Sequence, residues 1–147
     1  MAEFIKHSWV FPVIQSIHLI GLTMLVGTIG LIDLRLLGLG LRRYATFDLA
    51  AGLSPWTKRG LLTVLATGPL MFLSDLPRYL NNPAFILKMA LLAVALAAHF
   101  TLHRSVVGQG AVLHTTRQKL AAVLSLILWS SLVLAGRAIA DFDTRAY

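Results

Sequence analysis

Four long runs of apolar residues divide the 147-residue chain, and polar or helix-breaking residues separate them. The runs cover residues 9–41, 57–76, 84–102 and 116–140. A helix needs roughly 20 mainly apolar residues to cross about 30 Å of hydrocarbon, so each run is long enough to span a bilayer. The pattern predicts an all-α fold, an antiparallel four-helix transmembrane bundle, with residues 1–147 forming a single membrane domain.

Prolines and glycines indicate where these helices begin and bend. Pro12 falls in the first turn of the first run, where proline is tolerated. Pro55 marks the entry to the second run, after a connector over residues 42–54 that we expect to lie along the membrane interface. Gly68 and Pro69 predict a kink in the second helix. The first run exceeds the bilayer thickness, so its helix should tilt or project.

Composition narrows the chemistry further. Hydrophobic residues make up 57% of the chain, charged residues 13%, and the mean hydropathy is +0.77, which excludes an ordinary soluble domain. The net charge of +7 therefore belongs at membrane edges, and no nucleic-acid partner is expected. The chain has no cysteine, which excludes thiolate metal sites and covalently attached haem.

The sequence contains no nucleotide-binding loop and no nucleophile elbow, so an electron carrier is favoured over a hydrolase or transferase. The N-terminal residues lack the pattern of a signal peptide, so we expect the first helix to be retained.

His18 is the sharpest chemical feature, because it lies well inside the first apolar run. An ionisable group at this depth is rare without a partner. An interhelical hydrogen bond from a neutral imidazole is the simplest interpretation. The functional alternative is an axial ligand to haem iron.

The third run carries His99 and His103 at i, i+4, a spacing that places both on one helical face. Such a pair can hold one metal ion, or one of the two can ligate haem. His18 and His99 would share a haem only if a depth offset of about 9 Å, at ideal helical rise, is closed by tilt. Met71 is a depth-compatible alternative ligand. Two other histidines are expected to be solvated, His7 and His114.

Charged residues near the membrane edges offer further partners. Lys88 and Arg137 should lie at similar depth, where they would meet haem propionates. Pairing of either cation with Asp75 is the structural alternative. Asp33 and Arg35 cannot face each other at i, i+2, so each should find a partner on another helix or in a loop.

Several segments carry a resemblance: SIHLIGLTMLVGTIGLIDLRLLGLG, SPWTKRGLLTVLATGPLMF, FILKMALL and VLAGRAIA. The chain resembles a family of small bacterial inner-membrane proteins with four predicted spans, which implies membrane location and topology but no activity. More loosely, histidines in the first and third runs are similar to those of four-helix b-type cytochromes, including the cytochrome b561 and copper-resistance D-like groups. The chain departs from their two-haem pattern, because His18 is the only histidine in the first run and the second and fourth runs have none.

We therefore expect a b-type haem protein that passes electrons between a membrane quinol or partner protein and another carrier. His18 and His99 are the expected axial ligands to haem b, with Lys88 and Arg137 near the propionates. The alternative is copper or other metal-ion handling through His99 and His103, with His114 as a further candidate. The candidate metal ligands of the chain are thus His18, for haem iron, and His99 and His103. A third hypothesis is a noncatalytic subunit of a larger membrane assembly. The lipid bilayer is the expected surrounding, and homo-oligomerisation stays open.

Basic residues predict the orientation of the bundle. Eight lie on the side of the first and third loops: Arg35, Arg42, Arg43, Lys58, Arg59, Arg104, Arg117 and Lys119. Five lie on the other: Lys6, Arg78, Lys88, Arg137 and Arg145. By the positive-inside rule the first group is cytoplasmic and both termini are periplasmic.

A reporter fused after Tyr147 should therefore be active if it works only in the periplasm and inactive if it works only in the cytoplasm. Replacing Arg42, Arg43, Lys58 and Arg59 together by glutamine should give mixed or inverted topology, because these residues flank the first loop. A cytoplasmic C-terminus in the parent protein would contradict the predicted orientation.

Overall fold

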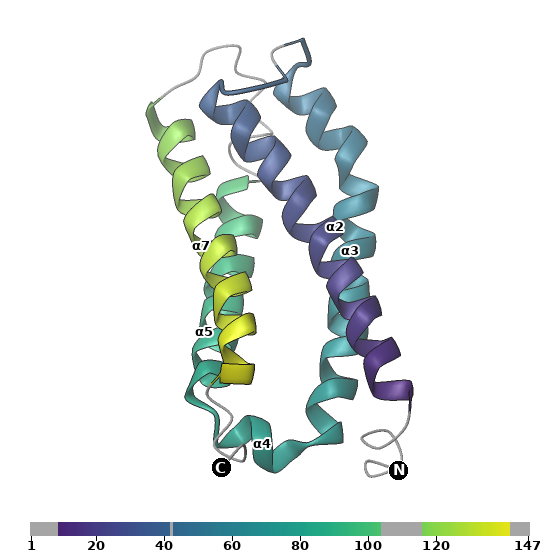
Figure 1. The fold of residues 1–147 in the computed structure, drawn as a ribbon. Helices are drawn as coiled ribbons and strands as arrows, with labels where there is room; N and C mark the ends of the chain where they lie inside the picture. Colours follow the sequence, from purple (N-terminus) through teal and green to yellow (C-terminus); the bar gives the residue numbers. More distant parts are fainter. Residues whose placement is uncertain (1–8, 42, 104–115, 142–147) are drawn as a thin grey trace.

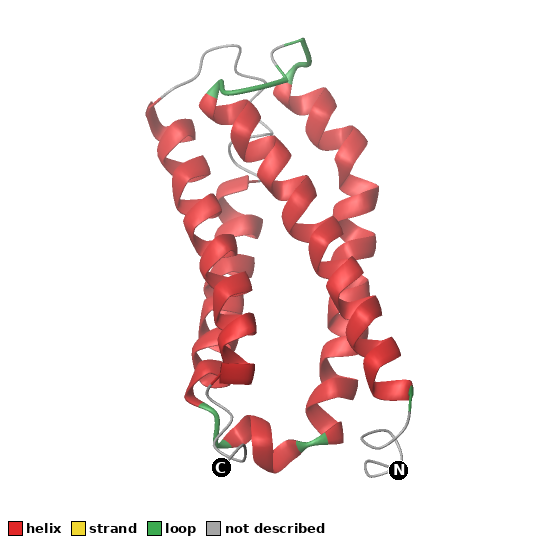
Figure 2. Ribbon diagram, in the orientation of Figure 1, coloured by secondary structure: helices red, strands yellow, loops and turns green. Residues whose placement is uncertain are grey.

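The computed structural model describes residues 9–41, 43–103 and 116–141. Four long helices run alternately up and down: α2 (Val10–Leu37), α3 (Thr46–Ser74), α5 (Pro83–Ala98) and α7 (Thr116–Asp141) (Figures 1 and 2). The short helix α4 (Leu76–Leu80) links α3 to α5, and a π-helical turn, η1 (His99–His103), continues α5. Within the described residues, three segments are long and apolar enough to cross a membrane, Val10–Leu37, Pro83–Thr101 and Thr116–Ile139. The predicted all-α four-helix membrane bundle is confirmed.

The start of α3 differs from the prediction. The helix begins at Thr46, so most of the predicted interfacial connector forms its first turns, and Pro55 lies inside the helix rather than at its entry. Pro69 also lies inside α3, shortly before its end. Arg59 stacks over the ring of Trp56 at 5.3 Å, an aromatic and cationic pair typical of the membrane interface. The α3 helix therefore extends past the apolar run that revealed it.

The end of α2 also comes earlier than the apolar pattern suggested. Gly38 adopts a left-handed conformation with φ of 77°. The N–H of Leu39 then donates to the carbonyl of Leu34 at 3.1 Å, which closes the last turn. Leucines beyond Gly38 belong to the loop, so the apolar run is longer than the helix.

The α2 and α3 helices pack along a seam of small and polar residues. Buried positions recur at spacings of three and four, the pattern of helices that cross at a shallow angle. They are His18, Gly21, Leu25 and Thr28 on α2, and Gly60, Val64 and Thr67 on α3. A Cβ added to Gly60 would lie 2.7 Å from the backbone nitrogen of Leu25 and 2.8 Å from the carbonyl oxygen of Gly21. The two backbones therefore touch at Gly60, as membrane helices do where small residues meet.

The α7 helix joins the second helix pair to the first. It packs against both α5 and α2, whereas α3 and α5 make little contact with each other. Leu25, Ile29, Ala95, Trp129 and Leu132 form the central apolar core between α2, α5 and α7. The bundle is consequently closed between α2 and α7 and less tightly closed between α3 and α5.

Side chains around α4 tie the two helix pairs together at one end. The Asn82 side chain donates to the carbonyl of Ile139 at 2.9 Å, and its oxygen accepts from the N–H of Ala84 at 3.0 Å. Phe72, Tyr79 and Phe85 stack beside this contact with centroid separations of 5.3 to 6.2 Å. The α4 linker is thus anchored to both α5 and α7.

Replacing Gly60 by alanine should destabilise the bundle, because the new methyl group would meet backbone atoms that cannot rotate away. Overpacking of this kind costs about 1–3 kcal/mol. Gly27→Ala is the matched control, since an added Cβ there has no neighbour within 4 Å. Thermal unfolding in detergent should show a lower midpoint for Gly60→Ala and an unchanged or slightly higher one for Gly27→Ala. Equal midpoints would refute the close backbone contact.

Candidate functional site

His18 is held by α3 in a defined tautomer. Its Nδ1 lies 2.8 Å from Oγ1 of Thr67, and the histidine is buried. The Thr67 hydroxyl donates its single proton to the carbonyl of Thr63 at 2.6 Å. The same oxygen must therefore accept from the imidazole, so the proton of His18 is on Nδ1 and the lone pair is on Nε2.

The second ring nitrogen of His18, Nε2, is not used by the contact with Thr67. Among the described residues Nε2 has no hydrogen-bond partner, and unlike Asp33 Oδ2 it is not fully buried. Gly68 leaves room beside the ring, since a Cβ added there would lie 3.7 Å from Cε1 of His18. His18 thus presents a basic nitrogen without a large side chain next to it on α3.

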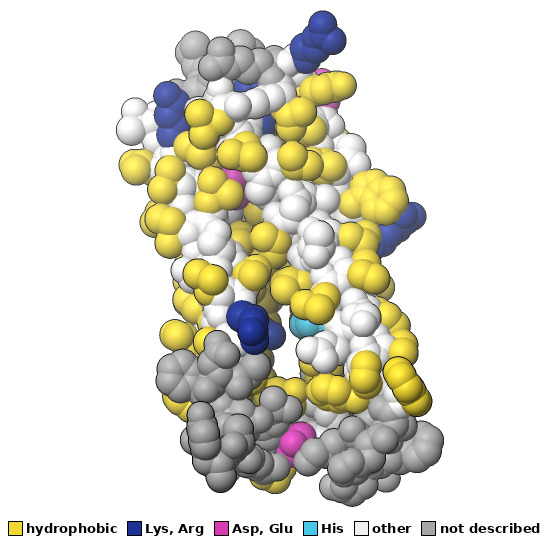
Figure 3. Space-filling model, viewed as in Figure 1, with side chains coloured by type: hydrophobic (Ala, Val, Ile, Leu, Met, Phe, Trp, Pro, Cys, Tyr) yellow, Lys and Arg dark blue, Asp and Glu magenta, His cyan; other side chains and the backbone are white. Residues whose placement is uncertain are grey.

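Lys88 on α5 faces the same region from the second helix pair. It lies within electrostatic range of His18, and its Nζ lies 3.6 Å from the position of a Cβ added to Gly136 on α7. In the space-filling view a histidine side chain and Lys or Arg side chains lie on opposite sides of a gap through the molecule (Figure 3). The predicted residues His18 and Lys88 therefore face the same region from different helix pairs.

The other predicted members of this site lie at its edge. Arg137 follows Gly136 on α7 and has an exposed side chain. Met71 is one turn from Thr67 on α3, and Asp75 stands at the break between α3 and α4. All three positions lie toward the α4 end of the bundle, as His18 does (Figure 1).

His99 is not brought to His18. It lies at the start of η1 and lines two cavities that contain residues from the opposite half of α2, among them Ile32 and Asp33. Asp33 is 15 positions beyond His18, or about 22 Å of helix at 1.5 Å per residue. His99 therefore belongs to a second polar region, near the end of the bundle that holds the first loop.

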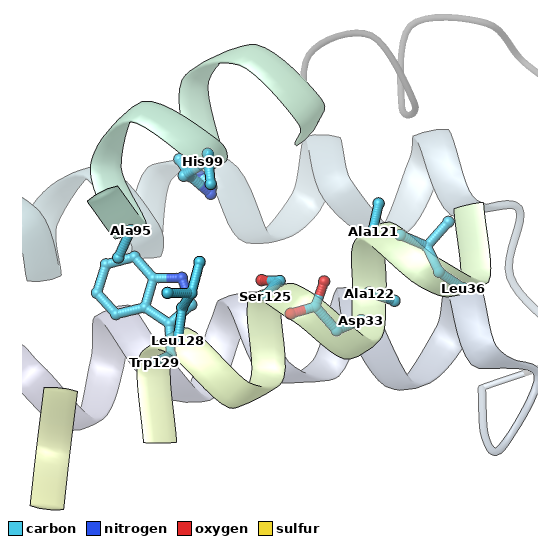
Figure 4. A pocket seen from close by; sticks show the side chains of 10 residues that line it. Asp33, Leu36, Ala95, His99, Ala121, Ala122, Ser125, Leu128 and Trp129 are labelled. Carbon is cyan, nitrogen blue, oxygen red and sulfur yellow. The ribbon is translucent and has the colours of Figure 1, made fainter. Parts of the chain in front are cut away.

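The second region centres on Asp33, whose side chain is only 2% exposed. The Ser125 side chain on α7 hydrogen-bonds to its carboxyl group, while Oδ2 is buried and has no partner among the described residues. Figure 4 shows Asp33 and Ser125 facing the same space as His99. Arg35 points elsewhere and donates from Nε to the carbonyl of Tyr44 in the loop, at 2.8 Å. Both Asp33 and Arg35 thus find partners outside their own helix, as the sequence predicted.

Part of the metal-site prediction falls outside the described structure. His114 lies there, as does His7, which was expected to be solvated. The side chain of His103 is likewise not described, although its backbone belongs to η1. Within the described ranges, no three His, Asp or Glu side chains gather in a way that could hold a metal ion.

Comparison with known proteins assigns the chain by sequence. A model of a family of unknown function, DUF6644, matches residues 8–142. The chain belongs to this family. The match carries no link to the cytochrome b561 or copper-resistance D-like groups. No curated protein and no solved structure matches the chain.

Proposed function

We propose that this protein is a b-type haem protein of the bacterial inner membrane that takes part in electron transfer, with His18 as a ligand to the iron. The observation that supports this proposal best is the state of the His18 ring. Its Nδ1 proton is used by Thr67, so Nε2 is the nitrogen left for a metal. Neutral imidazole in this form is the usual histidine ligand of haem iron.

The hydrogen bond between His18 and Thr67 resembles those that orient metal-bound histidines in other proteins. A histidine that binds a metal nearly always donates its other ring N–H to a hydrogen-bond acceptor, which fixes the ring and raises its basicity. Thr67 is itself anchored to the carbonyl of Thr63, so it cannot turn away to donate to the ring. The ring orientation is therefore set before any cofactor arrives.

Lys88 supplies the charge that a haem would need from the protein. A lysine side chain inside a membrane bundle is costly unless an anion or a polar group accompanies it. Haem carries two carboxylates, and Lys88 lies across from His18 on the other helix pair. Cofactor binding between the two helix pairs would then join an iron ligand from α2 to a carboxylate partner from α5.

The geometry favours one histidine ligand rather than a His18 and His99 pair. His99 lines a cavity together with Asp33 and Trp129, and Asp33 is far from His18 along α2. Met71 is the predicted alternative closest to the site, one turn from Thr67. A quinol or a redox protein is the electron partner that this proposal implies.

Protein expressed with a haem precursor and purified in detergent should show a Soret band. His18→Ala should remove or strongly alter this band, because the substitution deletes the proposed iron ligand. His99→Ala is the control and should leave the band unchanged. A colourless parent protein, or a His18→Ala variant with the parent's spectrum, would rule out the proposal, and loss of the band in His99→Ala would instead favour the bis-histidine arrangement.

Thr67→Val should weaken haem binding without abolishing it. Valine keeps the shape of threonine but cannot accept the Nδ1 proton, and loss of such an outer-shell partner typically costs 10–100-fold in metal affinity. Thr63→Val is the matched variant, since the Thr63 hydroxyl bonds only to the carbonyl of Arg59 on its own helix. Haem titration of the two apoproteins should give a higher Kd for Thr67→Val alone. Equal affinities would remove the assigned role of Thr67.

A further inference from the structure

A water-sized cavity is lined by Asp33, whose Oδ2 has no hydrogen-bond partner among the described residues. It has a volume of about 20 Å³ and is lined by residues of α2, α5, η1 and α7, including Asp33, His99, Ser125 and Trp129. A space of this size is large enough for one water molecule, provided that polar groups line it. Asp33 Oδ2, the Ser125 hydroxyl and the His99 ring provide such groups, and Figure 4 shows all three side chains directed into the same space.

A second, larger cavity adjoins the first. Its volume is about 400 Å³, and it lies between α3 and α5, the two helices that make little contact. Its lining is mainly apolar, and α3 contributes three polar side chains to it, Ser54, Thr57 and Lys58. His99 and Trp129 line both cavities, so they form the partition between them.

The backbone at His99 departs from a regular helix. The α5 helix ends at Ala98, and His99 opens a π-helical turn. Single π-helical turns are rare in proteins and occur frequently at functional sites. Here the wider turn begins at the residue that separates the two cavities.

We propose that Asp33 is a proton-binding site, reached from the larger cavity through His99 and one water molecule in the smaller cavity. A proton taken from solvent passes to one nitrogen of His99, leaves from the other to the cavity water, and binds Asp33 Oδ2, which becomes a neutral carboxylic acid. Water is the only other participant. An ionisable residue buried within a membrane helix commonly marks a proton path.

The groups that face this path come from every surrounding helix. Among the described residues the titratable ones are Asp33 on α2, His99 on η1 and Lys58 on α3, and α7 contributes the hydroxyl of Ser125. None of these residues is assigned to the haem site, so the proton site and the haem proposal can be tested independently.

Infrared spectroscopy of the full-length protein in lipid bilayers tests the proposal. Lowering the pH should produce a carboxylic acid C=O band that Asp33→Asn removes. Asp48→Asn is the matched control and should leave this band in place, because Asp48 is an exposed carboxylate in the first turn of α3. Ser125→Ala should shift the band without removing it, since the acid loses a hydrogen bond but remains.

His99→Phe tests the path itself. It keeps a ring in the partition but removes both nitrogens, so hydrogen–deuterium exchange of the Asp33 band should slow at least tenfold while its amplitude is unchanged. An absent Asp33 band would overturn the proton site. An unchanged exchange rate in His99→Phe would overturn the route through the larger cavity.

Discussion

The backbone contact at Gly60 sets the register of the first helix pair. With Gly60 seated against Gly21 and Leu25, the antiparallel helices place Thr57 opposite Thr28 and Thr67 opposite His18. The two side-chain contacts, at 2.9 and 2.8 Å, lie on either side of the same close approach. Because helices are rigid over a few turns, the orientation of His18 depends on a position that has no side chain at all.

Hydrocarbon imposes the second constraint. Polar side chains in a membrane helix need partners, and most hydroxyls here donate to the carbonyl four residues earlier, as in Ser16, Thr23, Thr63 and Thr101. These residues are satisfied within their own helix and require nothing from the rest of the fold. His18, Lys88 and Asp33 are different, because each faces a residue of another helix. The residues with interhelical contacts are therefore the ones on which function can depend.

The sequence predicted the helices of this fold better than it predicted how residues on different helices are placed relative to one another. Apolar periodicity marks helices locally, so the four long helices and the position of His18 at a helix interface followed from it. Pro55 was misread as a helix entry, because a proline inside a helix has the same local signature as one in the first turn. The offset between His18 and His99 was underestimated, because depths were counted from the start of each apolar run. The position of His99 along the bundle is set by the contacts of α7 with both α2 and α5. Such contacts join segments that are distant in the sequence, so the apolar periodicity of each segment does not reveal them.

An apolar core separates the two polar regions. Five side chains fill the bundle between His18 and Asp33: Leu25, Ile29, Ala95, Trp129 and Leu132. The cavities that reach Asp33 therefore do not continue to His18.

Any influence of one polar region on the other would then be electrostatic. At about 20 Å and an effective dielectric constant of about 20, two unit charges interact by about 0.8 kcal/mol. Protonation of Asp33 would consequently change an equilibrium at His18 by less than about fourfold, since a tenfold change requires about 1.4 kcal/mol. The fold thus holds two polar sites in one small bundle that can each be altered with little effect on the other.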